Sequence, residues 1–198
     1  MAVLSATADD GGIFFEETDG LIINSLTAMD VRRTPYVDED GDVVINQSGS
    51  TSSYDVTVTA GDAIALGSII TGDTATVTTS SGAIVENADG GINVTARTLD
   101  LAAEEDIGLS AYPINTNVET ITVVTTDGAI YLKEGSGATL QSLVAVGTDK
   151  DIILTNTTGD LDLGTITAAG DTVTITNNGG NITDDNGGTL NITADDVT

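Results

Sequence analysis

Internal repetition is the feature that most limits the folds open to this chain. Residues 10–20 (DGGIFFEETDG) recur as residues 127–137 (DGAIYLKEGSG), a shift of 127 − 10 = 117 positions. Residues 61–69 (GDAIALGSI) return as residues 159–166 (GDLDLGTI), and residues 90–96 (GGINVTA) return as residues 187–194 (GGTLNITA). In repeat proteins each unit packs mainly against its neighbours. We therefore expect a first module at residues 1–117 and a second, truncated module at residues 118–198 of one continuous solenoid.

Short β-strand patterns fill most of the sequence. Segments rich in Val, Ile and Thr alternate in polarity and are separated by Gly-Asp, Gly-Gly and Asn-Gly steps, whereas no segment has a convincing helical period. Equivalent aliphatic residues recur every 17 to 21 positions, as in the pairs Val58 and Val77 (19), Val77 and Val94 (17), Leu154 and Ile175 (21), and Ile175 and Ile192 (17). This spacing predicts an all-β fold, a parallel β-helix (β-solenoid) with rungs of about 17–21 residues. Inward aliphatic residues would stack into columns, and outward Thr, Asn and Asp would face water.

A tandem β-sandwich is the alternative, because it also has short strands with a turn every ~8–12 residues. Two observations disfavour it. The short period of about 20 residues recurs within the longer repeat unit. The chain also has no Trp, the residue that packs in the core of an immunoglobulin-like sandwich.

Two stretches interrupt the regular pattern. Residues 31–54 are an insertion in the first module, which we expect to form either a hairpin, with strands at 34–37 and 42–46, or one extra rung. Residues 102–117 are expected to form a loop at the junction of the two modules.

The charge balance excludes several classes of partner. The chain has 31 acidic and 5 basic residues, a formal net charge of −26. Nucleic-acid binding needs a basic footprint, and anionic membrane surfaces would repel the chain. Nor does any apolar run approach the ~18 residues of a membrane span. We expect the acidity to keep a long β structure soluble and separate, and to attract cations.

Catalysis is not expected. The chain has no His and no Cys, which excludes the usual nucleophilic triads and disulfides. Its Asp residues recur at the predicted corners, where turn formation explains them.

One short segment predicts a metal site. Asp38, Asp40 and Asp42 place carboxylates at alternate positions beside a glycine, which suits calcium, although the twelve-residue EF-hand spacing and its closing Glu are absent. The alternative is a solvated acidic turn. Calcium is the one cofactor that we expect.

One small basic patch predicts a partner contact. Arg32 and Arg33 precede Tyr36, whose ring would offer a stacking face to a protein or glycan. The alternative is that the arginines pair with neighbouring acids.

The repeats also resemble a known family. The pattern Gly-Asp-aliphatic-x-Leu-Gly-(Ser/Thr)-Ile at residues 61–69 and 159–166, with residues 106–118 and 128–131, is similar to the repeats of filamentous-haemagglutinin-like proteins of bacteria. The resemblance implies a right-handed parallel β-helix, export to the cell surface, and work as an adhesin or stalk. It implies no catalytic residues. The first residues are not a signal peptide, so we expect any export signal to lie outside this sequence.

Together these observations predict a structural or adhesive segment of an extracellular bacterial repeat protein. Its expected partners are neighbouring repeats of a longer chain and a cell-surface glycan or protein, with no nucleic acid and no membrane insertion. Two alternatives remain: a glycan- or protein-binding module that uses residues 31–54, and, more remotely, a polysaccharide-active β-helix enzyme.

Overall fold

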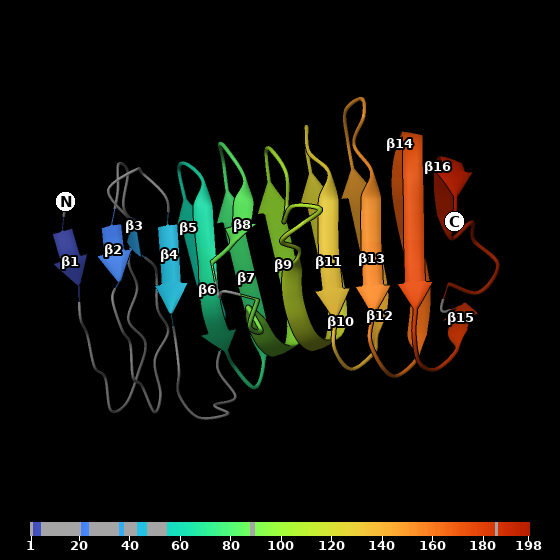
Figure 1. Ribbon diagram of the computed structural model, residues 1–198, viewed down its shortest axis with the longest axis horizontal. Coiled ribbons are helices and arrows are strands. Elements are labelled where there is room, and N and C mark those ends of the chain that lie inside the picture. Colours follow the sequence, from blue (N-terminus) through green and yellow to red (C-terminus); the bar gives the residue numbers. More distant parts are fainter. Residues whose placement is uncertain are drawn as a thin grey trace.

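Parallel strand pairing dominates the computed structural model of this chain, which winds into a β-solenoid (Figure 1). The structure describes residues 55–198, apart from 88, 89 and 185, together with the backbone pairing of four strands nearer the N-terminus. Within these residues every regular element is a strand. The strands are β1 (Ala2–Leu4), β2 (Leu21–Ile23), β3 (Tyr36–Val37), β4 (Val43–Asn46), β5 (Val56–Ala60), β6 (Ile64–Ile70), β7 (Thr74–Thr79), β8 (Ile84–Glu86), β9 (Val94–Ala103), β10 (Ile114–Thr125), β11 (Ile130–Glu134), β12 (Ala138–Ala145), β13 (Ile152–Asn156), β14 (Leu161–Asn177), β15 (Ile182–Asp184) and β16 (Ile192–Val197).

The windings form two ladders of hydrogen-bonded strands, which Figure 1 shows as a nearer and a more distant row. Ladder A contains β4, β6, β8, residues 94–95 of β9, residues 114–117 of β10, β11, β13 and residues 173–177 of β14. Ladder B contains β5, β7, residues 98–103 of β9, residues 120–125 of β10, β12 and residues 161–168 of β14. β15 and the start of β16 extend ladder B. The predicted parallel β-helix is therefore confirmed, and the β-sandwich alternative is wrong.

Aliphatic side chains stack into continuous columns between the ladders. Each buried Val, Ile or Leu contributes about 1.5–3 kcal/mol relative to an exposed one. The column of ladder A contains Ile64, Ile84, Ile107, Ile130, Ile152 and Val173, all 0% exposed. The column of ladder B contains Val58, Val77, Leu101, Val123, Leu143 and Ile166, none more than 1% exposed.

The length of a rung varies more than the sequence pattern indicates. Val58 pairs with Val77, and Leu154 pairs with Ile175, as predicted. The other two predicted pairs are wrong, because Val77 pairs with Leu101 and Ile192 pairs with Ile166. The paired residues of these two rungs lie 24 and 26 positions apart.

One column changes from apolar to polar along the solenoid. Its successive members are Ile69, Val94, Thr116, Glu134, Asn156 and Asn177. Glu134 is 0% exposed. Its carboxylate accepts hydrogen bonds from Thr116 Oγ1 (2.6 Å), Ser136 N (2.8 Å) and Ser136 Oγ (3.0 Å). Bonds to a charged acceptor are among the stronger hydrogen bonds, and they offset the cost of burying this acid.

Two strands of the predicted insertion are described, β3 and β4. β3 pairs antiparallel with β4, Tyr36 opposite Val44. β4 also pairs in parallel with β6 and so belongs to ladder A.

The predicted junction loop is shorter than expected. Its first two residues end β9, and residues 114–117 begin β10. The expected module boundary after residue 117 lies inside β10, and the core columns pass through it without a break.

Candidate functional site: a threonine face and a raised loop

The outward surface of ladder B is lined mainly by threonine, and we call it the threonine face. Its positions alternate along each strand with the buried columns, so the side chains point to solvent. The first column contains Thr74, Thr98, Thr120, Thr139, Asp162 and Thr183. The second contains Thr57, Thr76, Asp100, Thr122, Ser142 and Thr165. The third contains Thr59, Thr78, Ala102, Val124, Val144, Thr167 and Thr193.

Register fixes the geometry of this face. Neighbouring rungs are ~4.8 Å apart, and alternate residues of one strand are about 6.6 Å apart. The threonine face is therefore a two-dimensional lattice of hydroxyl and methyl groups. A bulge at Gln141, where the register shifts between β10 and β12, is an irregularity in it, and Gly164 of β14 lies opposite this extra residue.

The outward surface of ladder A has a different character. Its positions hold Val85, Thr95, Asn115, Tyr131, Lys133, Ile153, Thr155, Thr174 and Thr176. Apolar, amide, aromatic and basic side chains are mixed there with threonine.

Ladder A also carries a raised loop at residues 108–113. Ile107 pairs with Ile130, and Ile114 pairs with Leu132. A step of seven residues in one rung therefore lies opposite a step of two residues in the next rung. The extra residues leave the ladder and close on themselves through paired backbone hydrogen bonds between Leu109 and Tyr112 (3.0 and 2.9 Å). Leu109 is 42% exposed and Tyr112 is 62% exposed. The raised loop therefore presents an aliphatic and an aromatic side chain to solvent.

A buried asparagine holds the base of this region. Asn93 is 0% exposed, and its Nδ2 donates to the carbonyl oxygens of Leu66 (2.7 Å) and Gly67 (3.0 Å) in the preceding rung. Its Oδ1 accepts the N–H of Asn115 (2.8 Å) in the following rung. One side chain thus joins three successive rungs.

The second copy of the motif repeats this arrangement on ladder B. Asn191 Nδ2 donates to the carbonyl oxygens of Leu163 (2.7 Å) and Gly164 (3.2 Å). It also donates to Asp184 Oδ1 (3.1 Å). Hydrogen bonds from the Asn186 backbone and the Asn191 side chain hold the pKa of the exposed Asp184 below its usual value. The sequence repeat therefore preserves a local clamp while placing it on opposite ladders.

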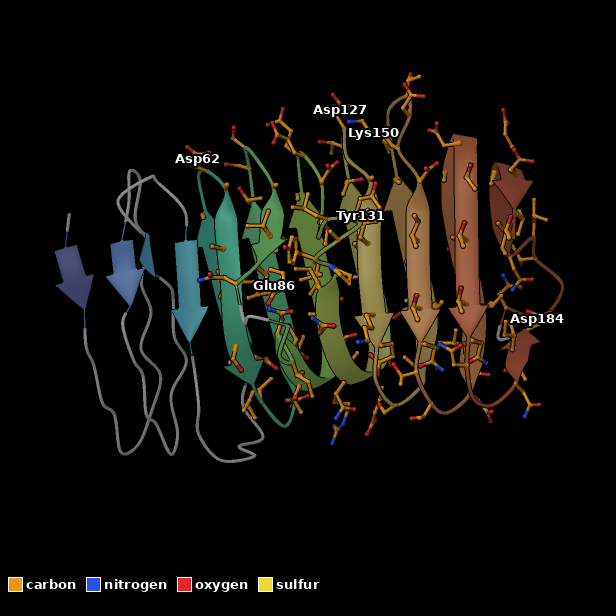
Figure 2. All side chains as sticks on the ribbon, viewed as in Figure 1. Asp62, Glu86, Asp127, Tyr131, Lys150 and Asp184 are labelled. Carbon is orange, nitrogen blue, oxygen red and sulfur yellow. The ribbon has the colours of Figure 1, made fainter. Side chains whose placement is uncertain are left out.

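Tyr131 lies on ladder A below the corner where Asp127 and Lys150 meet (Figure 2). Burial raises the pKa of its phenol, Asp106 and Asp151 raise it further, and Lys150 lowers it. Lys150 Nζ lies 3.6 Å from Asp127 Oδ1, a surface pair that contributes little to stability. Tyr131 is therefore a neutral hydrogen-bond donor at ordinary pH.

Corner carboxylates join adjacent rungs. Each accepts a backbone N–H from the next winding, which explains the recurrence of Asp at the corners without a chemical role. The bonds run from Ala129 to Asp106 (2.8 Å), from Thr172 to Asp151 (2.9 Å), and from Asn181 to Asp160 (2.6 Å). Among the residues that the structure describes, no group of three or more acidic side chains is placed to hold a metal ion.

The residues predicted to bind calcium or a partner fall elsewhere. Asp38, Asp40 and Asp42 lie outside the described residues, as do Arg32 and Arg33. Tyr36 lies in β3, where only the backbone pairing is described. Those two sites stay predictions. The sequence alone does not indicate the threonine face as a site, although it contains Thr-x-Thr segments at 57–59, 76–78, 120–122 and 165–167.

Comparisons with known proteins found no matching family model, no matching curated protein and no matching solved structure. In the part of the chain that the structure describes, no helix is long and apolar enough to cross a membrane.

Proposed function

We propose that this chain is a rigid β-helical segment of an extracellular bacterial repeat protein, acting as a stalk with adhesive side surfaces. The uninterrupted core columns carry this proposal. Because every described rung from β5 onward shares them, bending at one rung would disturb contacts in its neighbours. The surface acids, with a net charge of −26, oppose sideways association of such rods.

Tandem fusion tests the stalk role. One, two and three copies joined end to end are measured by small-angle X-ray scattering. A stalk predicts a maximum dimension that rises in proportion to copy number, by ~4.8 Å for each rung. A maximum dimension that rises clearly less than in proportion to copy number would show that the copies are joined flexibly, and it would contradict the proposal.

Surface exposure and adhesion are tested separately. In the source bacterium, intact cells are labelled with an antibody to this segment, and we expect staining without permeabilisation. Beads coated with the purified chain should be retained on the target surface under flow, and beads coated with a globular protein of similar charge are the control. Labelling only after permeabilisation would contradict the extracellular role.

The raised loop supports a second candidate function, a glycan- or protein-binding module. Exposed Leu109 and Tyr112 provide the apolar and aromatic groups that such contacts use. A glycan array probed with the wild-type chain and with Tyr112→Ala tests this function, and Thr174→Ala on the same ladder is the control. Signals that Tyr112→Ala does not reduce would contradict a role for the loop.

A further inference from the structure

The threonine face is a regular, nearly uncharged array of hydroxyl and methyl groups, and we propose that it binds ice. The ligand is water in its crystalline lattice. The inference goes beyond the stalk and adhesive roles proposed above, and it does not depend on them.

Flatness is the first argument. Strands of ordinary sheets rotate by roughly 20–25° from one to the next. Figure 1 shows the strands from β5 to β14 running nearly parallel along the solenoid. The columns of the threonine face therefore run side by side without wrapping around the molecule, which a planar crystal face requires of its partner.

Order within the face is the second argument. Threonine is β-branched, so its χ1 angle is restricted and its hydroxyl and methyl groups have few alternative positions. With ~4.8 Å between rungs and about 6.6 Å between alternate residues, the face repeats in two directions on β7, β9 and β10, whereas in β12 and β14 one extra residue separates the first column from the second. These spacings are of the same order as the oxygen repeats of ice, so many hydroxyls can meet lattice positions at once.

The hydroxyls are available to water. Those of Thr57, Thr76, Thr122 and Thr165 make no side-chain hydrogen bond within the described part of the chain, and the same holds for most other threonines of the face. Val124 and Val144 replace hydroxyls in the third column. Valine has the shape of threonine, so the surface stays even there and adds apolar groups that order the adjacent water.

Other ligand classes fit the threonine face poorly. None of its outward positions is aromatic, whereas polysaccharide and protein surfaces are usually held by aromatic side chains. None is basic, which disfavours anions. Its acids, Asp100, Asp162 and, beyond the last threonine, Asp195, lie on different rungs and form no cluster. The ligand class that fits this face best is therefore a neutral, repeating ligand that makes contacts with hydroxyl and methyl groups.

β-propensity alone does not explain the threonines. Threonine is favoured at any solvent-facing strand position, so propensity would enrich both ladders equally. Ladder A instead carries Val85, Tyr131, Lys133 and Ile153 at such positions. Threonine is therefore more frequent on the outer surface of ladder B than on that of ladder A, where Thr95, Thr155, Thr174 and Thr176 occur among other residue types.

Ice-growth measurements on the purified full chain test the proposal. We expect the wild-type chain to facet ice crystals and to produce thermal hysteresis in nanolitre osmometry. Thr122→Tyr, in the middle column, should lose most of the hysteresis because the ring lifts the lattice from the surface. Thr122→Val, which removes only the hydroxyl, should lose less. Thr174→Tyr, the same change on ladder A, should retain wild-type activity.

Circular dichroism shows that each variant is folded, and Thr167→Tyr replaces Thr122→Tyr if the latter is not. A wild-type chain that leaves ice growth unchanged would overturn the proposal, as would equal losses in Thr122→Tyr and Thr174→Tyr. Binding to cellulose or chitin powder, abolished by Thr122→Tyr and without an effect on ice, would overturn it in favour of a polysaccharide. Self-association through this face, seen in analytical ultracentrifugation and lost in Thr122→Tyr, without ice activity would also overturn it. The tandem-fusion result is independent of all these outcomes.

Discussion

Ladder A and ladder B share one core but have different outer surfaces. Their inward positions hold the same kinds of aliphatic residue at successive rungs. Outward, ladder B repeats threonine, whereas ladder A mixes Tyr131, Lys133 and Ile153 and carries the raised loop at residues 108–113. Stacking therefore constrains only alternate residues of each strand. The other half of the positions is free to specialise, and differences between the two ladders therefore point to function.

The largest expected effect comes from a charge placed on the inner side of ladder B. Val77→Asp buries an unpaired carboxylate between Val58 and Leu101, and we expect it to lower the free energy of unfolding by at least ~3 kcal/mol. Thr78→Asp, the same charge one residue away on the threonine face, is the control and should cost less than ~0.5 kcal/mol. Chemical denaturation measures both. Equal losses would mean that Val77 and Thr78 do not face opposite sides.

The two asparagine clamps should differ in strength. Asn93→Ala removes a fully buried side chain and leaves the Leu66 and Gly67 carbonyls and the Asn115 N–H without its hydrogen bonds. We expect the free energy of unfolding to fall by about 2–3 kcal/mol. Asn191→Ala removes the corresponding clamp of ladder B, where water can replace it, at a cost of about 1 kcal/mol. Hydrogen exchange measured by mass spectrometry should show local loss of protection around each site. A larger loss for Asn191→Ala would reverse this ranking.

Alkaline pH should weaken ladder A through Tyr131. Because the folded state raises the pKa of this phenol above 10.0, the unfolded state releases the proton first. Stability is therefore unaffected by this group below pH ~10 and falls as the pH rises through the interval between the two pKa values. Tyrosinate absorbance should show Tyr131 titrating late, and Tyr131→Phe should remove both this step and its share of the alkaline destabilisation. A titration of the wild-type chain with no late step would contradict the raised pKa.

The smallest effect is expected for Val124→Thr on ladder B. Val124 is 38% exposed, and the substitution preserves its shape, so stability should change by less than ~0.5 kcal/mol. The added hydroxyl extends the lattice of the threonine face. Thermal hysteresis should therefore equal or exceed that of the wild-type chain, whereas a clear decrease would argue against the lattice.

The sequence predicts the parallel solenoid and part of its register. Val58 with Val77 and Leu154 with Ile175 are correct because no loop interrupts those rungs. The pairing of Val77 with Val94 is wrong because Val94 pairs with Ile69 on ladder A, whereas the partner of Val77 on ladder B is Leu101. Hydrophobic spacing cannot distinguish the two partners, since both Val94 and Leu101 are aliphatic.

The candidate site is harder to predict. Thr-x-Thr segments alternate in the way that any half-buried strand does. Only the register between strands shows that Thr76 and Thr122 belong to one column while Thr174 belongs to the other ladder. Glu134 is likewise indistinguishable from a surface acid in sequence, because its donors come from other parts of its own corner and from the preceding rung.

The polar column has a consequence for how the chain finds its correct winding. Aliphatic columns would tolerate a displacement by one whole turn, because each rung offers a similar Val, Ile or Leu. Glu134 would not tolerate such a displacement. Placed beside Ile69 or Val94, its carboxylate would lose the hydrogen bond from the Thr116 hydroxyl and would lie among hydrocarbon side chains. We therefore expect this one acid to select the native order of turns during folding, by making the misaligned coils unfavourable.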